Sequence, residues 1–196
     1  MTRLPPLPFD EWDTGALSVI LPPGRPLGPS NVLGLFANHP ELARPFLTYN
    51  AYLLGRTLTI APRVREVAIL RMAWRRRCRY EWAQHVRLAR RAGVTDEEIA
   101  RIRAGVTGAL DAADTGDAGD GILGLVITAV DELDARSTLS DGTYRALAGA
   151  FDDRQLMDLV FTVGTYGLLA MAFNTFGLEL DPGLSDEGFD TADDDR

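Results

Sequence analysis

The chain has 196 residues, of which 46% are apolar and 24% charged, so it can build one substantial hydrophobic core. This composition excludes a disordered chain, a collagen-like chain and a disulfide-stapled miniprotein, since the single cysteine, Cys78, allows no intramolecular disulfide. The first 13 residues hold three prolines and three acids and no continuous apolar stretch. We find no signal-peptide core there and expect a cytoplasmic protein.

Positive charge is concentrated in one stretch of an acidic chain. The net charge is −8, and all 20 cationic side chains are arginines. Residues 62–103 hold 12 arginines against five acids, whereas the remainder holds 8 arginines against 23 acids. A nucleic-acid surface usually has a basic domain with stacking aromatics, whereas this basic stretch sits inside an acidic chain. We therefore expect no nucleic-acid partner. The stretch is either a solvated face whose arginines pair with acids in the chain or across an oligomer interface, or a site that recognises an anionic substrate.

Prolines mark the N-terminal stretch. Seven of the 11 prolines fall within residues 5–29. Proline lacks the backbone N–H that a helix interior needs, so much of this stretch cannot be regular helix. We therefore expect residues 1–29 to form an extended arm that lies on the body of the protein or on a neighbouring subunit.

Helical signals dominate after the arm. Pro40 begins a segment that closes on Gly55, and its internal Pro45 fits a helix if it falls in the first turn. Pro62 opens a second helix with apolar residues at helical spacing. Alternating strand patterns are absent, so we predict an all-α domain of seven to nine helices over residues 30–180.

Cap residues fix one helix boundary closely. Thr95 and Glu98 form a capping box, and Gly93 precedes it. The pattern predicts that one helix ends near Ala92 and a short one begins at Asp96.

The later part of the chain has a linker, two further helix signals and an acidic end. Residues 108–121 form a small, acidic, glycine-rich linker that precedes a helix. Ser140 and Asp141 predict the start of another helix. From Glu179 onward the chain holds eight acids and one arginine, so we expect residues 181–196 to form a mobile acidic tail.

Residues 159–178 hold no charged side chain across 20 positions, which is the minimum length of a membrane helix. Three glycines, three threonines, Tyr166 and Asn174 argue against a membrane span, as does the lack of an arginine cluster at either end. We expect instead a buried central helix whose small residues, such as Gly164 and Gly167, let another helix approach closely. The long apolar helix also predicts a homo-oligomer.

Three side chains of different chemistry share one helical stripe. Cys78, Glu81 and His85 stand at i, i+3 and i+7, so they can face one pocket. Glu81 can then hold His85 in one tautomer, as the orienting partner of a general base. The other interpretation is an ordinary surface Glu–His pair beside a buried cysteine. His39, which precedes Pro40, is interpreted as a helix-start residue and not as a catalyst.

The sequence from Pro62 to Ile99, which includes REVAILRMAW and CRYEWAQHVRLARRAGVTDEEI, resembles the carboxymuconolactone decarboxylase family. This family also contains the alkylhydroperoxidase D-like proteins. The later segment LSDGTYRALAGAFDDRQLMDLVFTVGTYGLLAMAFNTFGLEL resembles the C-terminal helices of the family. The resemblance implies the alkylhydroperoxidase D-like helical fold, an oligomer, and an active site on the helix that bears the motif.

The peroxidase branch of this family carries a Glu, a Cys-x-x-Cys pair and a His. Glu66 stands 12 residues before Cys78 and His85 stands seven after it, as that pattern requires. Glu81 occupies the place of the second cysteine, so the vicinal dithiol that reduces a peroxide cannot form. A thiol-dependent peroxidase that uses Cys78 alone, or a non-catalytic oligomeric binding protein, is therefore the alternative function.

The arrangement resembles instead the decarboxylase-like branch, whose members use no metal or organic cofactor. The resemblance implies a carboxy-lyase acting on a small anionic substrate, a carboxylated lactone or keto acid. It assigns His85 as the proton carrier, with Glu81, Glu66 and Cys78 as the other catalytic candidates. The candidates for substrate binding are cationic and aromatic side chains: Arg71, Arg75, Arg79, Tyr80 and Trp82.

Two departures limit the mechanism. Gln84 stands where many relatives have a second histidine, so a mechanism that needs two imidazoles is in doubt. A metal site built from Glu66, Glu81 and His85 is the weaker alternative, because the chain has only two histidines.

Overall fold

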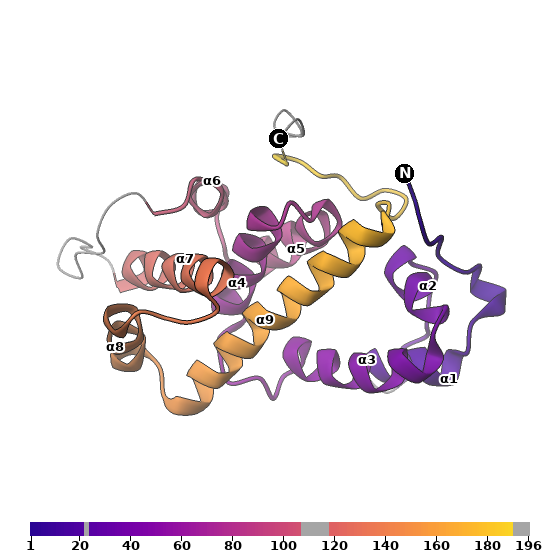
Figure 1. The fold of residues 1–196 in the computed structure, drawn as a ribbon, viewed down its shortest axis with the longest axis horizontal. Helices are drawn as coiled ribbons and strands as arrows, with labels where there is room; N and C mark the ends of the chain where they lie inside the picture. The colour runs from indigo at the N-terminus through magenta and orange to yellow at the C-terminus, as the bar shows by residue number, and fades with distance from the viewer. Residues whose placement is uncertain (22–23, 107–117, 190–196) are drawn as a thin grey trace. The chain divides into compact units, whose positions relative to one another are not determined.

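A computed structural model describes residues 1–21, 24–106 and 118–189. Within these residues it has nine α-helices, two short 3-10 helices and no strand (Figure 1), which confirms the all-α prediction of seven to nine helices. The 3-10 helices are η1 (Phe9–Glu11) and η2 (Ser18–Ile20). The α-helices are α1 (Thr14–Leu17), α2 (Asn31–Ala37), α3 (Pro40–Leu54), α4 (Pro62–Arg75), α5 (Arg79–Arg91), α6 (Asp96–Ala104), α7 (Ala118–Arg136), α8 (Asp141–Ala150) and α9 (Asp153–Phe176).

The chain folds into two compact units. The first consists of Met1–Leu58 and Ala172–Leu184, and the second of Thr59–Met171 and Ser185–Arg196. The helix α9 begins in the second unit and ends in the first. The predicted single domain over residues 30–180 has different boundaries from these two units, and its division from the arm and the tail stays a prediction.

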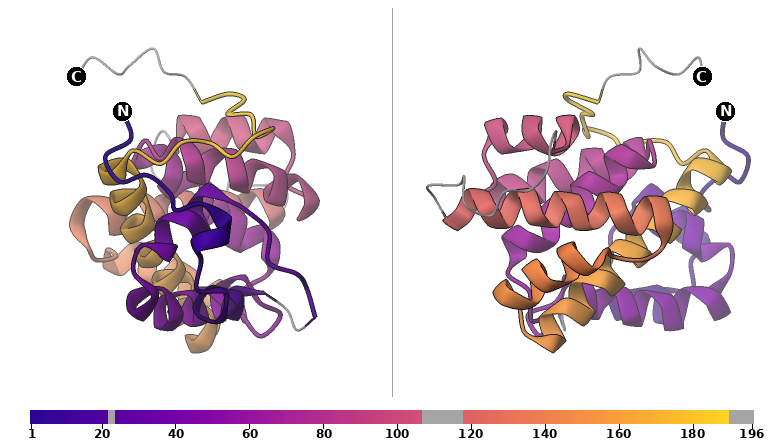
Figure 2. Two further views of the ribbon diagram at one scale, coloured as in Figure 1. Left: turned by 90° about the vertical axis from the view of Figure 1, so that its right-hand side faces the viewer. Right: turned by 60° about the vertical axis from the view of Figure 1, so that its left-hand side comes forward.

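In the first unit, α1, α2 and α3 pack around one another (Figure 2). The predicted arm is not extended throughout, since Asp13 caps α1 by accepting the backbone N–H groups of Gly15 and Ala16. The arm also approaches α2 closely. The Leu7 N–H donates to the carbonyl of Gly34, and a Cβ at position 34 would lie 2.7 Å from Pro6. The core side chains of this unit are Trp12, Leu17, Leu33, Ala37, Ala43 and Leu47.

The boundaries of α3 match the sequence prediction, with one correction. His39 is the N-cap, and its Nδ1 accepts the Leu42 N–H at 3.4 Å, while Gly55 follows the last helical residue. Pro45 lies in the second turn and not in the first. The carbonyl of exposed Glu41 therefore receives no N–H from position 45, and this is tolerable because water can replace that bond.

In the second unit, α4 packs most extensively against α5 and α7. Residues 66–73 of α4 are all buried, so this helix is the centre of the unit. As predicted, Pro62 occupies its first turn, and Thr95 and Glu98 form the capping box that starts α6. The preceding helix, α5, ends at Arg91, within one residue of the predicted end.

The linker predicted over residues 108–121 lies largely outside the described residues. The helix that follows it, α7, begins at Ala118 and so takes in the end of the predicted linker. Ser140 caps α8 as expected, because its hydroxyl accepts the Thr143 N–H. Glu132 of α7 accepts the N–H and the hydroxyl of Ser140, which ties α8 to α7.

The apolar segment 159–178 lies mostly in α9, which is long and apolar enough to cross a membrane by length and composition alone. Within its most apolar 18-residue stretch, 61% of the residues are buried, as in a core helix of a soluble protein. Gly167 packs against Met72, 3.7 Å from the position of a Cβ. Gly164 has no atom from another part of the described residues within 4 Å of a Cβ position, so no other described helix approaches it there. The exposed apolar side chains of α9 are Met157, Val160, Phe161, Leu168 and Met171.

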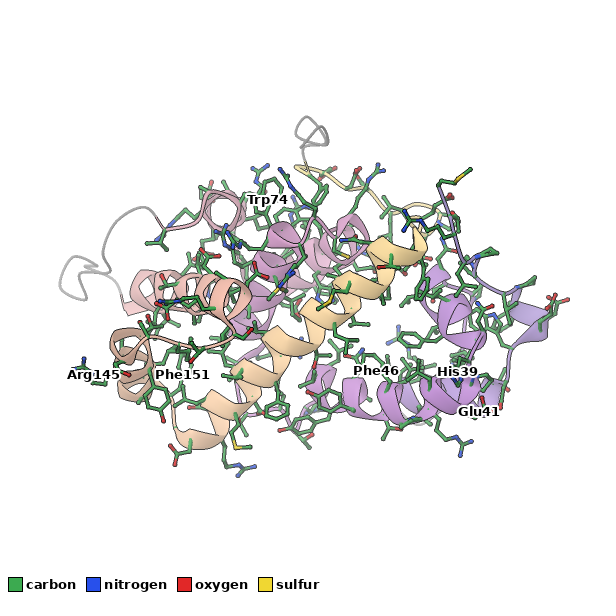
Figure 3. All side chains as sticks on the ribbon, viewed as in Figure 1. His39, Glu41, Phe46, Trp74, Arg145 and Phe151 are labelled. Carbon is green, nitrogen blue, oxygen red and sulfur yellow. The ribbon has the colours of Figure 1, made fainter. Side chains whose placement is uncertain are left out.

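Part of the predicted mobile tail packs on the second unit. The indole N–H of Trp82 donates to the carbonyl of Glu187 at 3.1 Å, and Asp186 pairs with Arg79. The Phe189 ring stands edge-on to Trp74, with centroids 5.5 Å apart. Figure 3 labels Trp74 on the side of the helices along which the tail passes. Residues 190–196 lie outside the described residues.

Candidate active site

A tight turn between α4 and α5 sets the positions of the site residues. The Cys78 N–H donates to the carbonyl of Ala73 at 2.8 Å, and Arg77 has a φ of 52° between them. A residue with a positive φ directly after a helix end is usually glycine, and here it is Arg77. The chain reverses there, so Glu66 on α4 and His85 on α5 lie about 15 Å and 10 Å from the turn along their helices. The spacing in the sequence therefore places the two side chains at similar levels along the neighbouring helices α4 and α5.

The centre of the site is the imidazole of His85 between two carboxylates. Its Nδ1 lies 2.7 Å from Oε2 of Glu66, and its Nε2 lies 3.6 Å from Oε2 of Glu81. The three residues are 6%, 0% and 4% exposed, in the order His85, Glu66, Glu81. The Nδ1 contact is a hydrogen bond, whereas 3.6 Å is too long for one.

Arg65 fixes the charge of Glu66. Its Nε and Nη2 both lie 2.8 Å from Oε1 of Glu66, and the other carboxylate oxygen faces His85. Burial alone would raise the pKa of Glu66, but the hydrogen bonds and charges of His85 and Arg65 outweigh burial and hold it below its usual value. Glu66 is thus a carboxylate, and it accepts a hydrogen bond from Nδ1 of His85. The other ring nitrogen, Nε2, faces Glu81.

The pKa of Glu81 is shifted in the direction opposite to that of Glu66. Burial, together with the nearby charge of Glu66, raises its pKa to about 7, even though His85 opposes the shift. Its Oε2 has no hydrogen-bond partner within the described residues. A carboxyl group with this pKa can carry a proton at neutral pH, and it lies next to a nitrogen that can take or supply one.

Tyr166 of α9 forms one wall of the site. Its ring stands at 87° to the imidazole of His85, with centroids 4.9 Å apart. Burial first, then the charges of Glu81 and Glu66, raise the pKa of the phenol well above its usual value. The hydroxyl group therefore stays protonated.

Cys78 is fully buried at the N-cap of α5. Burial and the neighbouring carboxylate of Glu81 raise the pKa of the thiol far above its usual value. The thiolate is the reactive form of cysteine, so this environment opposes nucleophilic or peroxidatic chemistry.

The structure does not bring the three predicted substrate-binding arginines to the site. Arg71 is 6% exposed, and its Nε and Nη2 donate hydrogen bonds to the carboxylate of Asp131, at 2.7 and 2.8 Å. Its Nη1 donates to the carbonyls of Ile102 and Arg103. This guanidinium holds α4, α6 and α7 together.

The other two arginines also have acidic partners elsewhere. Arg75 lies 3.0 Å from Asp134, and Arg79 pairs with Asp186. The interpretation of the basic stretch as a face whose arginines pair with acids of the same chain therefore fits these residues. Of the cations in the described ranges, Arg65 is the one that contacts the carboxylates of the site.

The two aromatic candidates on α5 are buried. Trp82 packs against Trp74 and Phe189, with ring centroids 5.3 and 6.1 Å away. Tyr80 is 4% exposed, and its hydroxyl accepts a hydrogen bond from Gln84 at 3.2 Å. Trp82 thus belongs to an aromatic cluster that holds the tail.

Glu66, and not Glu81, lies within hydrogen-bond distance of the imidazole, whereas the sequence-based prediction assigned the orienting position to Glu81. The catalytic roles of both residues stay predictions. Sequence reasoning also missed Arg65 and Tyr166. Arg65 is adjacent to Glu66 in a helix, where neighbours do not usually face each other, so no spacing rule marks it. Tyr166 lies in a helix that is apolar over most of its length.

The arrangement can transfer a proton between Glu81, His85 and a bound molecule without another group. In the described residues no group of three or more His, Cys, Asp or Glu side chains has an arrangement that could hold a metal ion.

Comparison with family models matches residues 40–114 to the Carboxymuconolactone decarboxylase family. The matched range includes α3 to α6 and therefore Glu66, Cys78, Glu81 and His85. It confirms the family resemblance seen in the sequence, and it ends before Tyr166. Searches of curated proteins and of solved structures give no match.

Proposed function

Through residues 40–114 the chain belongs to the carboxymuconolactone decarboxylase family, and we propose that it is an acid–base enzyme that needs no cofactor. Its substrate is a small anion of the carboxylated lactone or keto acid type, and its reaction class is carboxy-lyase. The family contains both decarboxylases and alkylhydroperoxidases. The choice between them rests on the chemistry of the site residues.

One observation carries this proposal: the buried carboxyl group of Glu81, with a pKa of about 7 and an unpartnered oxygen, lies beside Nε2 of His85. General acids and bases work best when their pKa lies near the working pH. Burial next to a second carboxylate is a common way to raise the pKa of a glutamate to that value.

The proposed reaction balances with one proton from solvent. The bond between the substrate carbon and its carboxylate breaks, the electron pair moves into a conjugated carbonyl of the substrate, and carbon dioxide leaves. Glu81 gives its proton to the carbon that lost the carboxylate. Solvent then supplies one proton to Nε2 of His85, and Glu66 stabilises the imidazolium that forms. Nε2 passes this proton to Glu81, which restores the starting state.

The peroxidase alternative lacks support from the site. The thiol of Cys78 is fully buried with a raised pKa, and Glu81 stands where the second cysteine would be. A peroxidase needs an accessible thiolate and a resolving thiol.

The proposal includes a homo-oligomer in the cytoplasm. Five large apolar side chains are exposed along α9, and four of them are more than half exposed. Exposed apolar patches of this kind commonly mark protein–protein contacts. A second copy of the chain is the partner we propose for this face.

The test is a screen for carbon dioxide release from small carboxylated lactones and keto acids. The expected result is that the wild type acts on at least one compound and that Glu81→Gln does not, while the exposed Glu97→Gln on α6 acts normally. Consumption of a hydroperoxide with a dithiol, lost in Cys78→Ala, would contradict the proposal. So would a hit on which Glu81→Gln is as active as the wild type.

A further inference from the structure

One face of α9 points toward the two helices that carry the site. Asp158 accepts hydrogen bonds from the N–H and hydroxyl of Thr59, at 2.7 and 2.6 Å, just before α4 begins. Eight residues later, Tyr166 packs on His85 of α5. Residues at i, i+4 and i+8 share a helix face, so Thr162 lies on the same face between these two contacts.

Thr162 has a buried hydroxyl group without a partner. The residue is 0% exposed, and its Oγ1 makes no hydrogen bond within the described residues. Threonine in a helix often donates to the carbonyl four residues earlier, as Thr165 does to Phe161 and Thr48 does to Arg44, each at 2.7 Å. A buried hydroxyl without a hydrogen bond lowers the stability of the folded protein. We therefore expect it to have a partner that the free protein lacks.

Two more polar side chains belong to the same part of the second unit. The side chain of Tyr166 is one helical turn from Thr162, with Cβ atoms about 5–6 Å apart. Tyr166 is 2% exposed and packs edge-on against the imidazole of His85. Oε2 of Glu81, which lies 3.6 Å from Nε2 of the same imidazole, has no hydrogen-bond partner within the described residues. Two buried oxygens, one on α5 and one on α9, therefore lack a protein partner near the contact between Tyr166 and His85.

The chemistry of these groups selects an oxygen-rich ligand. Two hydroxyls can donate hydrogen bonds, and protonated Glu81 can donate a third or pass on its proton. Hydrogen-bond donors in a water-poor site favour a carboxylate, a ketone or an enolate oxygen, on which negative charge is present or develops.

We infer that Thr162 and Tyr166 bind a substrate oxygen, a carboxylate or carbonyl oxygen that lies opposite Glu81. This inference rests on the proposed role of Glu81 and adds the helix α9 to the site. It also supplies the recognition of an anion that Arg71, Arg75 and Arg79 do not provide at this position. Neither residue touches the reacting proton, so both are binding residues.

The experiment uses the full-length protein and 4-oxopentanoate, a small anion that has one carboxylate and one ketone. Calorimetric titration measures its dissociation constant for wild type, Thr162→Val and Tyr166→Phe. The matched controls are Thr165→Val, which removes a hydroxyl that is bonded within its own helix, and Tyr144→Phe on the exposed side of α8. We expect the two site variants to bind about tenfold or more weakly, and both controls to bind within about twofold of wild type.

Thermal unfolding gives an independent readout. Thr162→Val removes a hydroxyl without a partner, so its melting temperature should equal or exceed that of wild type. Thr165→Val removes a bonded hydroxyl and should melt at the same or a lower temperature. A lower melting temperature for Thr162→Val would show a structural partner for this hydroxyl and would overturn the inference.

Other outcomes separate this inference from the proposed reaction. Equal binding by all variants, or no binding by wild type up to the solubility limit of the probe, overturns the inference. If Glu81→Gln still abolishes carbon dioxide release in that case, the proposed function stands without it. If the variants bind as expected but no tested compound loses carbon dioxide, the proposed reaction fails and the binding site stands.

Discussion

Nδ1 of His85 lies 2.7 Å from Glu66, while Nε2 of the same ring lies 3.6 Å from Glu81. The two carboxylates differ in charge as well as distance. Arg65 and His85 lower the pKa of Glu66, whereas burial raises the pKa of Glu81 to about 7. Pairs of titratable groups whose environments push their pKa values apart commonly divide the acid and base work of a site. In the proposed reaction Glu66 orients the ring, and Glu81 exchanges the proton.

The first prediction follows from this division. Glu81→Gln and His85→Ala should each lower the rate of carbon dioxide release by about 10²- to 10⁴-fold, the usual loss when a general acid or base is removed. Glu66→Gln should cost less, about 10- to 100-fold, because the amide oxygen still accepts a hydrogen bond from Nδ1. Circular dichroism of each variant checks the fold. A larger loss for Glu66→Gln than for Glu81→Gln would reverse the assigned roles.

The pH dependence of the rate should follow the ionisation of Glu81. In the wild type the rate should fall as pH rises through about 7, because Glu81 loses the proton that it delivers. Measurement of kcat over pH for Glu66→Gln tests whether the fall belongs to Glu81. If the fall persists in this variant but moves to lower pH, as the loss of the Glu66 charge requires, the assignment holds. If the fall disappears with Glu66, the titrating group is another one.

Local signals in the sequence predicted the helix boundaries well. The capping box of Thr95 and Glu98, the glycine before it and the proline at the start of α4 act within a few residues, so they can be read without the fold. The position of Pro45 was the exception. The helix continues past it because tertiary packing of α3 outweighs the loss of one exposed hydrogen bond.

The composition of the site was less predictable because it depends on contacts between distant residues. The family resemblance brought Glu66 and His85 together, but the partner that buries Arg71 is Asp131, 60 residues away. Thr162 and Tyr166 lie in a helix that is apolar on nearly every side, so its sequence does not show which face meets α5. Such assignments require the packing of the folded chain.

Protein stability should also report the raised pKa of Glu81. The folded state binds this proton more tightly than the unfolded chain does, for which the pKa is 4.5. The folded state is therefore favoured at low pH, and its stability falls as pH rises from about 4.5 to 7. The change in the free energy of unfolding should be on the order of a few kcal/mol.

Denaturant unfolding of wild type and Glu81→Gln between pH 5 and pH 8, roughly the window in which Glu81 titrates, measures this effect. The free energy of unfolding of the wild type should decline across the range, and the variant should lack most of that decline. Glu97→Gln on the surface of α6 is the control and should keep the decline. Identical pH profiles for wild type and Glu81→Gln would mean that Glu81 ionises at its usual pKa.

Cys78 should be chemically inert in the folded protein. Its thiol is fully buried and has a raised pKa, so iodoacetamide should label it far more slowly in the native than in the unfolded state. Cys78→Ala should keep catalysis within a few fold of the wild type. Mass spectrometry of the labelled protein gives the native labelling rate. Fast native labelling, or full loss of activity in Cys78→Ala with an intact fold, would make the thiol the chemical centre.

The last prediction concerns the exposed apolar face of α9. Phe161 is 55% exposed and lies between Met157 and Leu168, which are 61% and 51% exposed. If a second copy covers this face, Phe161→Asp places a charge in an apolar contact and should convert the assembly to monomers at micromolar concentration. The control Leu42→Asp alters a side chain of similar exposure, 53%, on α3 and should leave the assembly intact. Light scattering coupled to size exclusion measures the mass of each. A monomeric wild type would contradict the oligomer, whereas assembly unchanged in Phe161→Asp would move the contact away from α9.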